Sequence, residues 1–374
     1  MTPLGNNHSE RNIDRVLNVL IVDDSAVVRQ VLTALLSHEG GMNVTAAANP
    51  VIAMSKMERS RPDVIILDLE MPRMHGLTFL QKIMSENPIP VVICSSNAAK
   101  GTEAAFRALE QGAVGIVSKP QVGIRGFLEE SAVMLIDTVK GAAQSRVKLR
   151  APASTPIQGY LDADIVLPPA RTGPLSLTMD KVVAVGASTG GTEALRVLLG
   201  AMPENAPGLV IVQHMPQAFT GPFAARMNEL STIEVKEAAN GDQVRKGLAL
   251  IAPGNKQTLL RTNGLRYEVE VVDGPLVSRH RPSVNVLFRS VAQAAGPNSV
   301  GVIMTGMGND GADGMLEMKQ AGARTIAQDE SSCVVFGMPK EAIARGAVDE
   351  VLALEKIPSA VLRHFQNLRA SRFG

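Results

Sequence analysis

The strongest constraint on the fold is an alternation of short apolar, β-branched runs with longer helical patterns. It begins with LNVLIV at 17–22 and the amphipathic stretch at 25–38, and it repeats five times up to residue 140. Continuous apolar strands separated by helical segments are typical of a parallel sheet that helices cover on both faces. We therefore expect residues 17–140 to form one α/β domain with a five-stranded parallel sheet.

A different composition interrupts this alternation at residues 141–179. Five prolines lie there, and neither a helical nor a strand period is sustained, which is typical of a linker. The alternation resumes with KVVAVGA, although 233–272 contains shorter strands and turns. We expect residues 180–370 to form a second α/β domain, doubly wound and mostly parallel, with an antiparallel insertion.

The composition excludes several classes of protein. A chain of 374 residues with 45% apolar residues suits two soluble domains, and a net charge of +1 gives no support to nucleic-acid binding. Two cysteines are too few for a disulfide framework, which indicates a reducing compartment. The polar N-terminus does not resemble a signal peptide, and no apolar run is long enough to insert into a membrane. We expect a cytoplasmic protein.

Polar side chains follow four of the five strands expected in the first domain. Asp23 and Asp24 come after the first strand, Asp68 after the third, Ser95 after the fourth and Lys119 after the fifth. Ligands of parallel α/β sheets bind beyond these carboxyl ends. Three carboxylates that meet there repel one another unless a cation binds, and oxygen ligands suit Mg²⁺. A lysine and a hydroxyl nearby suit a phosphoryl group on one carboxylate. The alternative interpretation is that these five residues are unrelated loop residues and form no common site.

The first domain resembles a response-regulator receiver. The resemblance lies in VDDS at 22–25, in ILDLEMPRMHGL at 66–77 and in SKP at 118–120. It implies a flavodoxin-like fold in which Asp68 accepts a phosphoryl group from a histidine kinase. Two positions depart from the usual pattern: His75 replaces an aspartate or asparagine, and Ile116 replaces an aromatic residue that often takes part in signalling.

The same resemblance implies a role for each polar strand end. Asp23 and Asp24 would hold Mg²⁺ together with Asp68 during phosphorylation. Lys119 would pair with the phosphoryl group, and Ser95 would move towards it.

In the second domain, KVVAVGASTGG at 181–191 breaks from an apolar run into glycines around Ser188. The stretch matches the G-x-S-x-G pattern of a nucleophilic serine. It also nearly matches the dinucleotide pattern G-x-G-x-x-G, but Ser188 replaces the glycine that lets the backbone approach a pyrophosphate. The next strand ends in Gln213 and His214, where a dinucleotide fold needs an acid for the ribose. Both departures from the dinucleotide pattern favour the interpretation of Ser188 as a nucleophile.

A nucleophilic serine needs a base, and the base needs an orienting acid. Of three histidines in this domain, His364 lies in a terminal amphipathic helix, and His280 lies between arginines that we expect to depress its basicity. His214 directly follows GLVIVQ, the strand that we expect beside the one leading to Ser188. We therefore predict His214 as the base.

The acid and the oxyanion donors come from the glycine-rich stretch SVGVIMTGMGNDGADG at 299–314. Asp310 follows a third strand end, whereas Asp313 lies one helical turn further on and is expected to cap a helix or face solvent. We expect the backbone N–H groups of Thr189 and Met307 to point at a developing oxyanion, each donor being worth about 3 kcal/mol. The alternative for these glycines is a loop that only needs positive φ.

The second domain also resembles a known family. GASTGGTEAL, VQHMP, HRPSV and GVIMTGMGNDGADGM are similar to the catalytic domain of the chemotaxis methylesterase (CheB) family. The resemblance spans most of residues 180–350, and the family's triad falls on Ser188, His214 and Asp310. It implies hydrolysis of glutamate γ-methyl esters on cytoplasmic helices of chemoreceptors, with release of methanol, and deamidation of receptor glutamines. The ester chemistry would need no cofactor.

The two resemblances together imply that the unphosphorylated receiver covers the Ser188 site and that phosphorylation of Asp68 activates the enzyme. Two alternatives remain open: a receiver that controls a nucleotide-binding domain, and a receiver that controls a non-catalytic interaction domain. Transcriptional control has no support, because the chain contains neither a helix-turn-helix pattern nor a basic patch.

Overall fold

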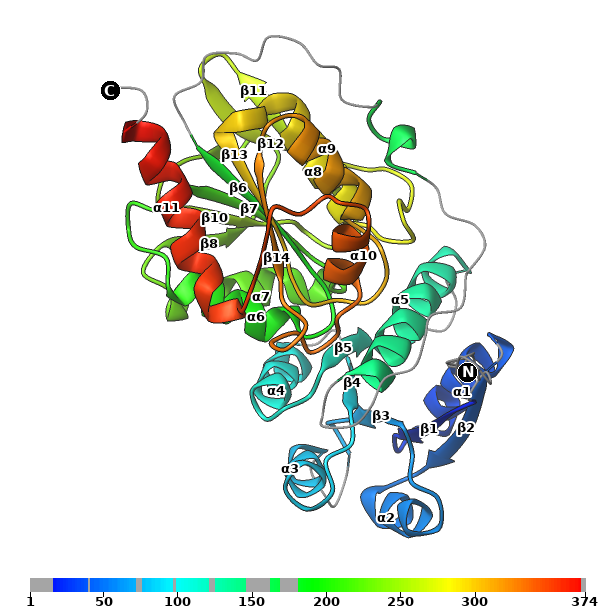
Figure 1. The fold of residues 1–374 in the computed structure, drawn as a ribbon. Coiled ribbons are helices and arrows are strands. Elements are labelled where there is room, and N and C mark those ends of the chain that lie inside the picture. The colour runs from blue at the N-terminus through cyan, green and yellow to red at the C-terminus, as the bar shows by residue number, and fades with distance from the viewer. Residues whose placement is uncertain are drawn as a thin grey trace, which may run out of the picture.

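The computed structural model describes residues 16–39, 41–71, 76–96, 99–120, 125–145, 162–168 and 181–370 (Figure 1). The first domain has a five-stranded parallel sheet in the order β2-β1-β3-β4-β5, which confirms the prediction. Its elements are β1 (Leu17–Val22), α1 (Ala26–His38), β2 (Met42–Ala47), α2 (Pro50–Arg59), β3 (Val64–Asp68), α3 (Gly76–Glu86), β4 (Val91–Ser95), α4 (Ala99–Glu110), β5 (Gly115–Ser118) and α5 (Arg125–Gln144).

Local sequence explains where the elements of this domain begin. Ser25 and Asn49 accept hydrogen bonds from the first turns of α1 and α2, and Pro50 occupies the first turn of α2. Every residue of β3 and β4 is buried. Because the strand order reverses between β1 and β3, the residues that follow these two strands flank the crevice where such folds bind ligands.

The second domain has a seven-stranded parallel sheet in the order β15-β14-β13-β6-β7-β10-β8 and a small antiparallel sheet, β11-β12-β9. The prediction of a mostly parallel domain with an antiparallel insertion is thus confirmed. Its elements are β6 (Val182–Ala187), α6 (Gly191–Gly200), β7 (Gly208–Gln213), α7 (Gln217–Leu230), β8 (Glu234–Glu237), β9 (Gln243–Val244), β10 (Leu248–Ile251), β11 (Gln257–Asn263), β12 (Arg266–Val272), α8 (Val284–Ala294), β13 (Ser299–Ile303), α9 (Ala312–Gln320), β14 (Arg324–Gln328), α10 (Met338–Ala344), β15 (Glu350–Leu352) and α11 (Ile357–Ala370).

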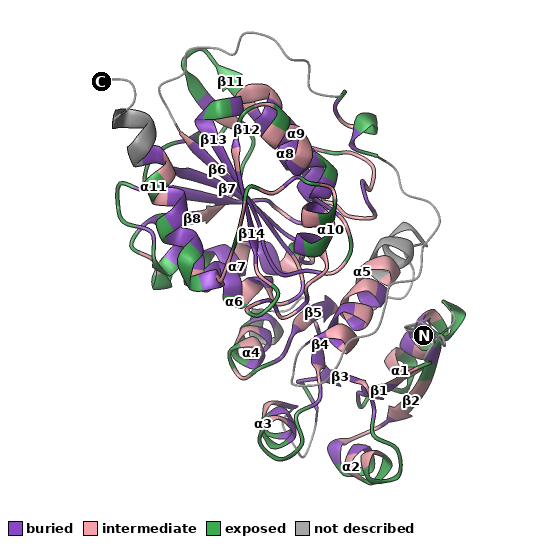
Figure 2. Ribbon diagram, viewed as in Figure 1, coloured by how far each residue is buried: buried purple, intermediate pink, exposed green. Residues whose placement is uncertain are grey.

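Strand β6 lies between β7 and β13, and this neighbourhood positions the site. Helices α8, α9 and α10 cover one face of the sheet, and α6, α7 and α11 cover the other (Figure 1). Figure 2 shows the central strands as buried. The short β15 and α10 were not expected from the sequence, because three to seven residues carry little periodic signal.

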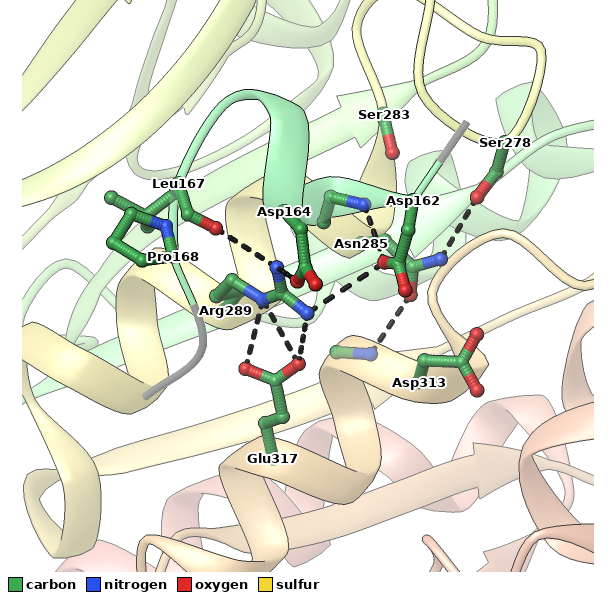
Figure 3. A network of polar contacts seen from close by, with 12 residues as sticks. Asp162, Asp164, Leu167, Pro168, Ser278, Ser283, Asn285, Arg289, Asp313 and Glu317 are labelled. Atoms are coloured by element: carbon green, nitrogen blue, oxygen red, sulfur yellow. Dashed lines mark hydrogen bonds and ion pairs between the residues drawn. The ribbon is translucent and has the colours of Figure 1, made fainter. Parts of the chain in front are cut away.

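Part of the stretch between the domains is described. Helix α5 continues through Gln144, and residues 162–168 pack against α8. The buried Arg289 of α8 holds this segment: it pairs with Asp164, donates to the carbonyl oxygen of Leu167 at 2.9 Å and pairs with Glu317 of α9 at 2.7 Å (Figure 3). Residues 162–168 are therefore anchored on the second domain.

Helices α4 and α5 of the first domain lie against the second domain (Figure 1). The ring of Phe106 in α4 lies 6.4 Å from that of Phe219 and 6.1 Å from that of Phe223, both in α7. Glu110 pairs with Arg226 of α7 at 3.0 Å. Aromatic contacts and an ion pair thus connect the two domains.

No helix among the described residues combines the length and apolar character that a bilayer crossing requires.

Candidate active site

Four polar residues at three strand ends of the first domain lie close together. Asp23 and Asp68 are buried, and their carboxylate oxygens lie within 4.8 Å of each other and of the exposed Asp24. Lys119 Nζ lies 2.7 Å from Asp68 Oδ2 and 3.3 Å from Asp23 Oδ2. Burial raises the pKa of Asp23. Burial by itself would lower the pKa of Lys119, but the hydrogen bonds and charges of Asp68 and Asp23 together raise it.

This cluster suits a hard divalent cation. Apart from its ion pair with Lys119, Asp23 Oδ2 has no hydrogen-bond partner among the described residues, so this buried oxygen can accept a cation. Three carboxylates beside one lysine leave excess negative charge, and oxygen donors match Mg²⁺.

Ser95 is buried at the end of β4, next to β3 and Asp68. Of the two positions that depart from the receiver pattern, His75 lies outside the described residues and Ile116 is buried in β5.

In the second domain, the strand register brings Ser188 and His214 together. Ala187 at the end of β6 pairs with Gln213 at the end of β7, so Ser188 and His214 leave neighbouring strands at the same level. On the other side of β6, β13 leads into the loop of Asp310. His214 Nε2 lies 2.9 Å from Asp310 Oδ2.

Asp310 is buried at the N-terminus of α8, where several donors hold its carboxylate. Ser283 Oγ donates at 2.7 Å, and the backbone N–H groups of Val284 and Asn285 donate at 2.7 and 3.0 Å. Burial alone would raise the pKa of Asp310, but the hydrogen bond from His214 and those from the backbone lower it. The carboxylate is therefore a fixed, ionised partner for the imidazole.

The other ring nitrogen of His214 is available for chemistry. Nδ1 is buried and makes no hydrogen bond with any described residue. With the Nε2 proton directed at Asp310, Nδ1 is the acceptor of the neutral ring. Ser188 and His214 line the same cavity, but the hydrogen bond between them is not formed in this state. Such contacts often form only when substrate binds.

His280 is a site residue that the sequence prediction set aside. Its ring stacks on that of His214 with centroids 3.7 Å apart and planes 5° apart, and its Nδ1 lies 2.7 Å from the carbonyl oxygen of Ser278. Burial, and then the neighbouring His214, lower the pKa of His280 to about 3. Arg279 also lowers this pKa, as expected from the sequence, but it contributes less than burial and His214. A neutral His280 restricts the tilt of the His214 ring.

The glycine turn after β6 is closely packed. Gly190 has φ of 78°, which favours glycine, and a side chain at Gly191 would collide with Gln213 Oε1 at 2.1 Å. Gln213 Nε2 donates to the carbonyl oxygens of Ser188 and His214 at 2.9 and 3.1 Å. The turn that carries Ser188 is thus tied to the strand that carries His214.

The remaining predicted residues divide into two groups. Thr189 and Met307 line the cavity beside Ser188, and no described residue accepts a hydrogen bond from either backbone N–H group. Asp313 pairs with Arg345 at 2.7 Å on the surface, as expected for a residue outside the site.

The first domain covers this site. The cavity beside Ser188 is also lined by Val114, Ile116 and Asp137 of the first domain, and it has a volume of about 30 Å³. That volume holds about one water molecule and not a glutamyl side chain. The Gly190 N–H, next to the serine turn, donates to the carbonyl oxygen of Val114 at 3.2 Å. A substrate therefore cannot reach Ser188 unless the domains move apart.

The fold and the site define a class: a response regulator whose output domain carries the elements of a serine hydrolase. Residues 183–361 match the family described as CheB methylesterase, and residues 19–125 match the response regulator receiver domain.

Two relatives agree with this class. A protein-glutamate methylesterase/protein-glutamine glutaminase of Anaeromyxobacter dehalogenans is 59% identical over 358 residues, covering 95% of this chain and 99% of the relative. One of Geobacter metallireducens is 57% identical, covering 93% and 98%. The crystal structure of the Thermotoga maritima CheB methylesterase catalytic domain is 36% identical, with a TM-score of 0.49, and covers 50% of this chain and 99% of that one. The chain belongs to the protein-glutamate methylesterase/protein-glutamine glutaminase (CheB) family.

Proposed function

We propose that this chain is a phosphorylation-activated methylesterase that hydrolyses glutamate γ-methyl esters on chemoreceptors and deamidates receptor glutamines, as an adaptation enzyme of chemotaxis. One observation carries the proposal: a serine, a histidine and a buried carboxylate follow three adjacent strands in a chain 59% identical to a named methylesterase/glutaminase. The substrates would be cytoplasmic helices of chemoreceptors, the phosphodonor a histidine kinase, and the compartment the cytoplasm.

In the proposed mechanism, Ser188 Oγ attacks the side-chain carbonyl carbon while His214 Nδ1 takes the hydroxyl proton. Asp310 holds Nε2–H and stabilises the imidazolium that forms. The tetrahedral intermediate then collapses: the C–O bond to the methoxy group breaks, and methanol leaves with the proton from Nδ1. Water, deprotonated by the same nitrogen, hydrolyses the acyl-enzyme to glutamate and regenerates Ser188.

The same residues serve deamidation, in which ammonia replaces methanol as the leaving group. The negative charge on the carbonyl oxygen is greatest in the tetrahedral intermediate. The backbone N–H groups of Thr189 and Met307 are the proposed donors to that oxygen, a role supported by their place in the cavity and by their freedom from other acceptors among the described residues.

In the receiver, Asp68 is the proposed phosphoryl acceptor. Asp23, Asp24 and Asp68 would hold Mg²⁺, which would shield the charge of the incoming phosphoryl group. Lys119 already contacts Asp68 and would pair with the added oxygens, and Ser95 would donate to them. A phosphoryl group adds about 1.5 to 2 negative charges, enough to bias the domain contact towards opening.

The test is release of methanol from methylated chemoreceptors by the full chain, with and without a small-molecule phosphodonor and Mg²⁺. We expect slow release that the phosphodonor accelerates. Absence of methanol under both conditions would reject the proposal. Saturable binding of NAD or ATP instead would favour the nucleotide-binding alternative, and receptor binding without turnover would favour the non-catalytic one.

Gly141 of α5 offers a direct way to open the domain contact. A Cβ atom there would lie 2.8 Å from Thr189 Oγ1 and 3.3 Å from Met307 Cβ, closer than packed atoms tolerate. We expect Gly141→Val to raise methanol release several-fold in the absence of a phosphodonor. The matched control is Gly200→Val in α6, where a Cβ atom meets nothing nearer than 3.9 Å. An unchanged basal rate in Gly141→Val would show that this contact does not limit access.

A further inference from the structure

One face of α5 lies over the catalytic serine. Met134, Asp137 and Thr138 line the cavity with Ser188, and Gly141 packs against Thr189 and Met307. The spacing of these four positions, i, i+3, i+4 and i+7, defines a single helical face. In the closed chain, a helix therefore already occupies the place that a helical substrate must take.

The one acid on this face contacts the second domain. Asp137 Oδ1 lies 3.4 Å from Arg279 Nη2, and Asp137 Oδ2 lies 3.9 Å from His280 Nε2. The side chains of Asp137 and Arg279 are 17% and 14% exposed. Burial raises the pKa of Asp137 despite the attraction of Arg279, so the loss of water outweighs the pairing. The contact therefore adds little net stability, and a carboxylate from another molecule can replace it.

Arg279 lies on a strained turn that is fixed to the catalytic machinery. Ser278 and Arg279 have φ of 49° and 69°, a region that residues with side chains seldom adopt and that recurs at functional sites. Two backbone hydrogen bonds between Val277 and His280, at 3.0 and 2.9 Å, close the turn. Ser278 Oγ accepts from Asn285 in the first turn of α8 at 3.0 Å (Figure 3). The backbone of Arg279 is thus fixed to the second domain, which also carries Ser188, while its guanidinium contacts Asp137 of the receiver.

We propose that Arg279 is a substrate-specificity residue that binds a carboxylate of an acidic helix, and that Asp137 of α5 takes this place in the closed chain. The inference rests on the proposed function. In α5, Asp137 contacts Arg279, while Gly141, four residues later, lies over Thr189 and Met307. A substrate helix bound in the same direction would place its reacting glutamyl side chain at the position of Gly141. Its recognised acid would then lie four residues before that glutamyl group.

The test uses the full chain with phosphodonor and two synthetic helical peptides. Each carries one glutamate γ-methyl ester, preceded four residues earlier by glutamate in one peptide and by glutamine in the other. We expect the wild-type KM for methanol release to be about tenfold lower for the glutamate peptide. Arg279→Gln should remove this preference mainly through KM, and Arg279→Lys should restore part of it. The control Arg245→Gln removes an exposed arginine that pairs with Glu234, and it should keep the preference.

Several outcomes would overturn the inference. Equal KM values of the wild type for the two peptides would overturn it. This comparison uses only the wild-type chain, so it does not depend on whether a variant folds. A preference that survives in Arg279→Gln would also overturn the inference. If Arg279→Gln only raised the rate without phosphodonor and left the preference intact, Arg279 would be a domain latch. Absence of methanol from both peptides would reject the proposed function itself, whereas release without preference would reject only the role of Arg279.

Discussion

Replacement of Ser188 by alanine is expected to abolish methanol release from methylated receptors. The substitution removes the only atom that forms the acyl-enzyme, and loss of the serine in subtilisin lowers kcat by about a millionfold. The fold should persist, because the contacts that hold this turn go through the backbone: the Ser188 N–H donates to the carbonyl oxygen of Thr305, and Gln213 donates to the Ser188 carbonyl oxygen. Methanol release and thermal unfolding are the two measurements.

The matched control is Ser359→Ala, which removes an exposed hydroxyl at the start of α11 and should retain full activity. Turnover by Ser188→Ala above about a thousandth of the wild-type rate would place the nucleophile elsewhere, since oxyanion donors and binding alone account for only a small residue of catalysis.

The second large effect is expected at Asp68. A phosphodonor with Mg²⁺ should raise methanol release by the full chain at least about tenfold, which needs a shift of only about 1.4 kcal/mol in the equilibrium between closed and open domains. Asp68→Asn cannot accept the phosphoryl group and should not respond. Glu58→Gln, which removes an exposed acid of α2, should respond as the wild type does.

Deletion of residues 1–150 removes the receiver and should raise the rate without any phosphodonor. The reason is steric, because receiver residues reduce the space beside Ser188 to about 30 Å³. A truncated chain slower than the intact, unphosphorylated one would argue against inhibition by the receiver. A phosphodonor response that persisted in Asp68→Asn would argue against Asp68 as the acceptor.

Much of the fold could be predicted because buried parallel strands are continuous apolar runs. LNVLIV and GLVIVQ appear as β1 and β7 with the bounds expected. Register then follows from parallel pairing, so residues immediately after adjacent strands must meet. Ser188 and His214 were predicted together on this ground, and their strands are indeed neighbours. The sequence did not predict β15, because its three residues are too few for a period to emerge.

The sequence by itself determined the two sheets, the linker composition and the residues at the strand ends, because these depend on periodicity over short stretches. Only the tertiary structure decided that His280 stacks on His214 and that Asp137 meets Arg279 across the domain contact. It alone also decided that Nδ1 of His214 makes no hydrogen bond with a described residue. The stacking and the domain contact join residues 66 and 142 positions apart in the chain, and no local pattern specifies which surfaces of two independently patterned domains pack together.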